Sequence, residues 1–227
     1  MNPPRTEQLI ESLASDLRRW RVVLSPLTVT LLWFSVSFLW VAGCLFLLGP
    51  YRDEWFAQTL QHPRLLLELL AGLGASFAMA LWGFLRSIRG TQARLGIVAA
   101  FVLAGVFVGS VGAGLLGHPA VEPSMAGKRE TCIWEALLIS LPPLIGAIGL
   151  IRRRFPLQPL QAAAPLAGAT MVLPATLMHV ACMCDPVHIF LSHILPAMAA
   201  TVVATVVVLA ANLITPEHPV PTPDHQK

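Results

Sequence analysis

The chain has 227 residues, of which 56 % are hydrophobic and only 12 % are charged. A soluble domain carries about 25 % charged residues, so this composition excludes a soluble globular protein and predicts an integral membrane protein. Because the formal net charge of +3 is small, we expect no direct binding of nucleic acid. The four cysteines are too few for the disulfide framework of a secreted protein.

The N-terminal arm, residues 1–25, is polar with one apolar stripe. Its apolar residues recur at three- and four-residue spacing, which predicts a short amphipathic helix. A helix of about 14 residues is marginal in water, so the arm needs a partner surface of protein or lipid headgroups. The residues that we expect to contact this partner are Leu9, Ile10, Leu13, Asp16 and Leu17.

Six apolar runs follow the arm, and each is near or above the roughly 20 residues that cross a bilayer as a helix. They cover residues 26–49, 65–85, 95–116, 132–151, 157–181 and 187–214, and residues 215–227 form a tail. The predicted fold is therefore all-α, an integral membrane bundle of six transmembrane helices.

Glycine and proline within the runs predict details of helix packing. Gly105 and Gly109 have the spacing of a GxxxG motif, so we expect the third span to pack closely on a neighbour. Prolines inside the last three spans predict kinks, and neighbouring helices must cover the backbone groups that they free. These prolines are Pro142, Pro143, Pro165, Pro174 and Pro196.

The arginines and lysines predict the orientation of the bundle. Eleven of the fifteen fall in the arm, the second and fourth connections and the tail, whereas four fall in the other connections. Because cytoplasmic segments are enriched in these residues, both termini are predicted to be cytoplasmic.

Ligand-type side chains gather at the opposite, external ends of the predicted helices. Ionisable and metal-binding residues are costly beside hydrocarbon and are therefore candidates for function. The candidates for metal or redox sensing are Cys132, Glu135, His179, Cys182, Cys184, Asp185, His188 and His193.

Spacing suggests how some of these candidates are arranged. His179 and Cys182 are three residues apart and share a helix face. Asp185 and Pro186 are typical of a helix start, as N-cap and first helical residue. Cys132 belongs to a different span, so a site that joins it to Cys182 would clamp several helices together.

The chemistry of the candidates leaves several alternatives open. Thiolate and imidazole ligands suit Cu(I) or Zn(II), and the nearby Met178 and Met183 favour copper. A redox couple between Cys132 and Cys182 is equally compatible with the sequence. Glu135 could be a ligand, a proton partner or a structural hydrogen bonder, and His193 could serve only to join helices.

Three segments of this chain resemble the NrsF-type family, negative regulators of an extracytoplasmic-function sigma factor. They are the stripe of the arm, the segment from Cys132 and Glu135 to Pro142, and the turn with Cys182, Asp185, His188 and His193. The resemblance implies a six-span anti-sigma factor of the bacterial inner membrane, which releases its sigma factor under heavy-metal or oxidative stress. It also implies that Cys132 and Cys182 are the sensor cysteines.

The resemblance thus predicts a regulator and not an enzyme, with the arm and the arginine-rich connections as its contacts to the sigma factor. Two alternatives remain. A quinone-coupled thiol oxidoreductase would normally use a Cys-x-x-Cys pair, which the sequence lacks. A metal transporter would need polar ligands across the whole membrane, whereas the ligands here stop near one face.

Overall fold

The computed structural model describes residues 24–49, 51–52, 54–88, 93–124, 127–152 and 159–214. Within these ranges all regular structure is helical, and six helices are long and apolar enough to cross a membrane. The prediction of an all-α, multi-pass chain is confirmed to this extent. The predicted amphipathic arm and the tail lie outside the described residues.

The helices begin and end within two residues of the predicted spans. The sixth span is formed by three consecutive helical pieces, and one short helix between the first two spans was not predicted. The elements are α2 (Pro26–Leu48), α3 (Trp55–Gln61), α4 (Pro63–Arg86), α5 (Arg94–Leu115), α6 (Cys132–Arg152), α7 (Pro159–Ala181), α8 (Pro186–Ile189), η1 (Phe190–Ile194) and α9 (Leu195–Ile214).

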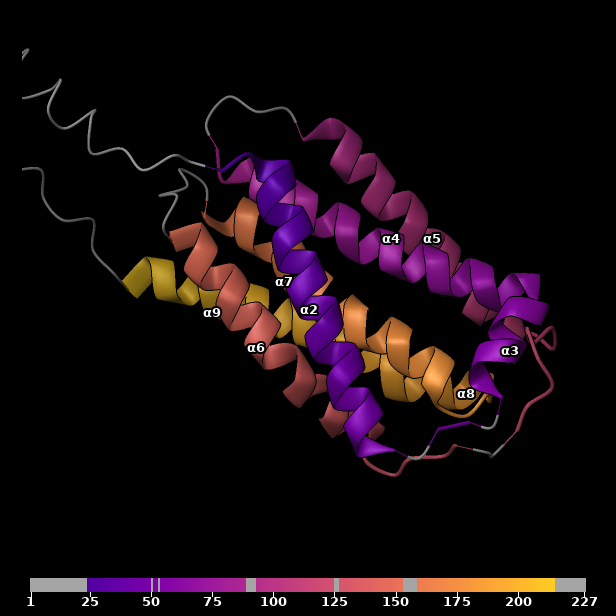
Figure 1. Cartoon of the computed structure of the whole chain (residues 1–227). Coiled ribbons are helices and arrows are strands. Elements are labelled where there is room, and N and C mark those ends of the chain that lie inside the picture. The colour runs from indigo at the N-terminus through magenta and orange to yellow at the C-terminus, as the bar shows by residue number, and fades with distance from the viewer. Residues whose placement is uncertain are drawn as a thin grey trace, which may run out of the picture.

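The long helices run alternately in opposite directions, so the bundle has two ends (Figure 1). At one end α2 begins and α9 ends. The other end, which we call the α8 end, holds α3, α8, the start of α6 and the end of α7. Arg86, Arg94 and Arg152 lie at the helix termini of the first end.

Helix α7 is the centre of the bundle. In the apolar 18-residue window of its span 83 % of the residues are buried, compared with 22 % in that of α2, and α7 contacts α2, α4, α6 and α9. Small buried residues such as Ala162, Ala169 and Ala175 let these neighbours approach it closely. A displacement of α7 would therefore be felt by most of the bundle.

Gly72 and Gly83 of α4 provide close helix contacts within the chain, whereas the predicted glycine pair of α5 does not. A Cβ atom on Gly83 would lie only 2.8 Å from the carbonyl oxygen of Ala162 in α7, and one on Gly72 would overlap Thr176. A Cβ on Gly105 or Gly109 would meet nothing within 4 Å. The expectation that these two glycines pack closely on a neighbouring helix is therefore wrong within this chain.

Pro143 of α6 is compensated by a tryptophan of α2. Pro143 has no N–H to donate to the carbonyl oxygen of Ile139, and the indole Nε1 of Trp40 donates to this oxygen at 3.0 Å instead. A second tryptophan of α2, Trp33, donates from Nε1 to the carbonyl oxygen of Pro143 itself at 3.0 Å. A neighbouring helix thus covers a backbone group that proline leaves without its usual partner, as predicted.

Candidate metal centre

Four ligand-type side chains converge at the α8 end of the bundle. They are Cys132, Cys182, His188 and His193, and one ligand atom from each lies within 4.8 Å of the others. We call these four residues the tetrad. They come from α6, the α7–α8 turn, α8 and η1, so the tetrad joins elements of the last three spans.

The two sulfur atoms of the tetrad are in direct contact. Cys132 is the first residue of α6, and Cys182 follows the last residue of α7. Their Sγ atoms are 3.4 Å apart, and both residues are 1 % exposed. Both cysteines are free thiols, so the pair can hold a metal or close to the roughly 2 Å of a disulfide.

His188 reaches the sulfurs because the sixth span starts at a fixed position. As predicted, Asp185 is the N-cap of α8 and Pro186 is its first residue. The Asp185 carboxylate accepts a hydrogen bond from the backbone N–H of His188 at 2.9 Å. The imidazole Nε2 of His188 then lies 3.4 Å from Cys182 Sγ.

His193 is directed to the tetrad by the π-helical segment η1, which widens the sixth span between α8 and α9. Its ring is 5.3 Å from the His188 ring, centroid to centroid. His193 is 1 % exposed, and neither of its ring nitrogens has a hydrogen-bond partner among the described residues. A buried imidazole usually finds such a partner, so this one is suited to a ligand that the chain itself does not supply.

Ser192 is a further residue of the centre, which the sequence reasoning missed. Its hydroxyl lies 3.4 Å from the Nδ1 atom of His188, four residues earlier. Histidines that bind metals usually hydrogen-bond through their second ring nitrogen, and this contact fixes the ring orientation. The spacing of four residues was the available signal, because such residues share a helix face.

Electrostatics distinguish the two tetrad sulfurs. A hydrogen bond from the Cys132 thiol and the neighbouring His193 imidazole hold the pKa of Cys182 below its ordinary value, although burial opposes this shift. Cys182 is therefore the sulfur that carries negative charge more readily, and thiolate is the form that binds metals and attacks oxidants.

The donor set of the tetrad fits a soft or borderline metal ion. Two sulfurs and two imidazole nitrogens are a common ligand set of tetrahedral zinc, and thiolate also suits Cu(I). The same two sulfurs could instead form a disulfide. Both alternatives that the sequence left open are compatible with this geometry.

The other predicted site residues have partners outside the tetrad. Glu135 accepts hydrogen bonds from Arg129 at 3.1 Å and from Thr131 at 2.5 Å. His179 pairs with Glu68, and Cys184 contacts the guanidinium group of Arg52. Asp185 acts as the helix cap. None of these four residues belongs to the group of ligand atoms that makes up the tetrad.

Loops cover the tetrad on the side of the α8 end. The carbonyl oxygen of Gly127 lies 3.6 Å from Cys182 Sγ, and the carbonyl oxygen of Arg129 lies 3.3 Å from Cys132 Sγ. Gly127 has a φ of 77° and a Cβ there would lie 2.7 Å from the backbone nitrogen of Arg52, so only glycine fits this crossing.

Comparison with known proteins adds no relative, since no family model, curated protein or solved structure matches the chain.

Proposed function

We propose that this chain is a membrane anti-sigma factor that holds an extracytoplasmic-function sigma factor until its tetrad senses a heavy metal or an oxidant. The observation that carries the sensing part is the convergence of Cys132, Cys182, His188 and His193 within 4.8 Å at one end of a six-helix membrane bundle. The resemblance of the arm and the cysteine segments to NrsF-type regulators supports the output. The proposal includes a position in the bacterial inner membrane, which the resemblance implies, with the tetrad on the periplasmic side, which the distribution of arginines favours.

The central position of α7 supports a route from the tetrad to the other end of the bundle. Cys182 directly follows α7, and α7 contacts α2, α4, α6 and α9 along its length. Metal binding or disulfide formation would pull Cys182 against Cys132 and change how α7 packs on α6. Such a change would alter the opposite ends of these helices, where the sigma factor is proposed to bind.

The energy of such a site is sufficient for a switch. Moving a two-state equilibrium from mostly bound to mostly free takes about 5.5 kcal/mol of differential binding. The free energy of zinc binding at structural sites is about 10–16 kcal/mol in small peptides. A fraction of this binding free energy would be enough to shift the equilibrium of the switch. The ligands must then be arranged better in one state of the bundle than in the other.

The buried polar residues favour a sensor over a metal transporter. Among the described residues, the buried charged groups Arg52, Glu68 and Arg129 all lie toward the α8 end, as the tetrad does. Further along α7 the buried polar side chains are the hydroxyls of Thr170 and Thr176. These hydroxyls do not form a path of strong metal ligands through the membrane.

The proposal is tested by release of the sigma factor in cells that carry a reporter for its genes. The double variant Leu13→Asp/Leu17→Asp should switch the reporter on without stress, because the arm loses its apolar stripe. Cys132→Ser should abolish the response to added metal or oxidant, whereas Cys44→Ser should respond normally. If the arm variant reaches the membrane at normal levels and the reporter stays silent, the arm does not hold the sigma factor.

A further inference from the structure

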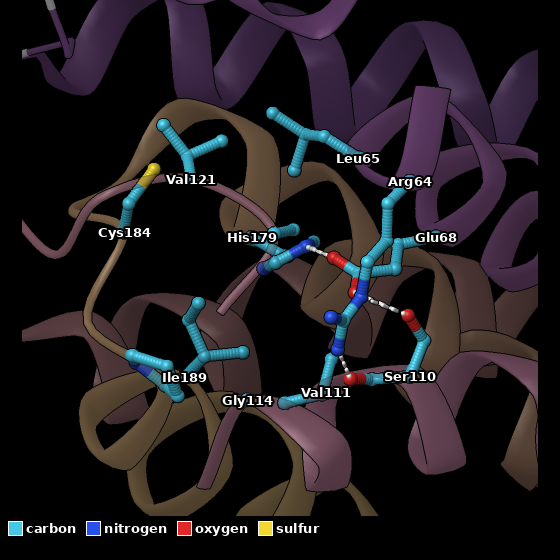
Figure 2. Close-up of a pocket in the computed structure, with 12 residues that line it drawn as sticks. Arg64, Leu65, Glu68, Ser110, Val111, Gly114, Val121, His179, Cys184 and Ile189 are labelled. Atoms are coloured by element: carbon cyan, nitrogen blue, oxygen red, sulfur yellow. Dashed lines mark hydrogen bonds and ion pairs between the residues drawn. The ribbon is translucent and has the colours of Figure 1, made fainter. Parts of the chain in front are cut away.

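A second polar site lies next to the tetrad and is separate from it. A small pocket opens between α4, α5 and the α7–α8 turn, and no tetrad residue lines it. Its polar lining residues are Arg64, Glu68, Ser110, His179 and Cys184 (Figure 2). The segment around Cys182 therefore serves two sites: Cys182 faces the tetrad, and its neighbours His179 and Cys184 line the pocket.

His179 is held in the manner of a metal-binding histidine. Its Nε2 atom lies 2.7 Å from a carboxylate oxygen of Glu68, and both residues are buried. Glu68 also accepts a hydrogen bond from Ser110 at 2.5 Å and pairs with Arg64 at 3.5 Å, as an ionised carboxylate does. The proton of a neutral His179 therefore lies on Nε2, between ring and carboxylate.

The second ring nitrogen of His179 has no such partner. Nδ1 is buried, and no hydrogen-bonding group among the described residues reaches it. With the proton on Nε2, Nδ1 has a free lone pair. A carboxylate that orients one imidazole nitrogen while the other is free is the usual second-shell arrangement of a histidine ligand.

Cys184 supplies a thiol to the same pocket. It is 6 % exposed, and the buried guanidinium group of Arg52 donates a hydrogen bond to its sulfur. Cys184 lies in the non-helical turn between α7 and α8, so its sulfur can move toward the imidazole without breaking a helix.

The charges around the pocket select the valence of the ion. Binding of a monovalent ion exchanges a proton for the metal: Cys184–SH + M⁺ gives Cys184–S–M + H⁺, and the net charge is unchanged. A divalent ion would add one positive charge beside Arg52 and Arg64. Among the described residues, Glu68 is the one carboxylate that lines the pocket, and it is already paired. The extra charge would therefore be buried without compensation from these residues.

We propose that His179 Nδ1 and Cys184 Sγ form a second metal site, which takes a soft monovalent cation such as Cu(I) or Ag(I). Sulfur and imidazole are ligands that Cu(I) prefers, and Ag(I) is its stable analogue in air. Glu68 positions the imidazole and does not bind the metal itself. This proposal rests on the pocket alone and is independent of the sigma factor.

The test uses full-length protein in which Cys184 is the only cysteine, made by Cys44→Ser, Cys132→Ser and Cys182→Ser. Ag(I) binding is measured in detergent by competition with a chelator of known affinity. We expect one Ag(I) per chain. His179→Gln should lower the affinity at least tenfold, and Glu68→Gln should lower it by about 10–100-fold, the usual effect of losing a second-shell partner. His118→Gln, which removes an exposed histidine of the same end, should leave it unchanged.

Unchanged affinity in the His179→Gln variant would overturn the proposal, because the thiol alone would then bind the metal. X-ray absorption of the Ag(I)-loaded single-cysteine protein gives a second criterion that does not require a His179 variant to fold. One sulfur and one nitrogen in the first shell support the site, whereas sulfur without nitrogen overturns it. Tighter binding of Zn(II) than of Ag(I) would contradict the charge argument.

Discussion

The tetrad depends on a fifth side chain, the hydroxyl of Ser192 at 3.4 Å from His188 Nδ1. Removing this contact by Ser192→Ala should lower the Zn(II) affinity of the tetrad by about 10–100-fold, because the His188 ring is no longer oriented. Ser192→Thr keeps the hydroxyl and is the matched control. Calorimetric titration of the purified protein checks this, and equal affinities for the Ala and Thr variants would show that His188 is positioned by packing alone.

Cys182 and Cys184 differ in how their reactivity depends on pH. The Cys132 hydrogen bond lowers the pKa of Cys182, while burial raises the pKa of Cys184. Thiolate is the reactive form and exists above the pKa, so Cys182 should remain reactive as the pH falls and Cys184 should lose reactivity first. In metal-free protein, mass spectrometry after treatment with a small thiol reagent should show the ratio of Cys182 to Cys184 labelling rising at lower pH. A falling ratio would contradict the assignment.

Some of these residue-level features could be predicted from the sequence and some could not. Cys132 and Cys182 were placed at the same end by counting spans and arginines, and the Asp185 cap followed from local rules. The Glu68–His179 pair spans 111 residues of sequence and depends on α4 lying beside α7. Hydropathy identifies spans but does not reveal which spans are neighbours, so this pair could not be predicted.

At the scale of elements, the contact between α4 and α7 rests on glycine. Gly83→Ala would place a methyl group 2.8 Å from the carbonyl oxygen of Ala162, and this overpacking should lower the free energy of unfolding by about 1–3 kcal/mol. Gly105→Ala is the matched control, since its methyl group meets open space. Unfolding in mixed detergents, followed by circular dichroism, measures both. Equal stability of the two variants would mean that α4 and α7 are not in close contact.

The π-helical segment η1 is the element that the sequence did not reveal. Hydropathy shows one continuous apolar run through α8, η1 and α9, and the run does not indicate a change from α- to π-helical hydrogen bonding. Because such segments shift the helix register, they often occur at functional sites. Here the shift falls between His188 and His193 and lets both rings reach the same two sulfurs.

At the scale of the whole molecule, the orientation in the membrane decides what the tetrad can sense. The arginine-rich end of the bundle should face the cytoplasm and the α8 end the periplasm. A reporter enzyme that is active only in the periplasm should be active when fused near Ala126 and silent when fused after Lys227. The reverse pattern would place the tetrad in the cytoplasm, where external metal does not reach it directly.

The most direct test of the central claim is the metal coordination of the tetrad itself. X-ray absorption at the zinc edge is measured on full-length protein loaded with one Zn(II), in which Cys44 and Cys184 are replaced by serine. We expect two sulfurs at about 2.3 Å and two nitrogens at about 2.0–2.1 Å, from Cys132, Cys182, His188 and His193. His193→Ala should remove one of these nitrogens. A first shell of oxygen ligands, or a protein that binds no metal and whose two cysteines do not form a reversible disulfide, would contradict the account.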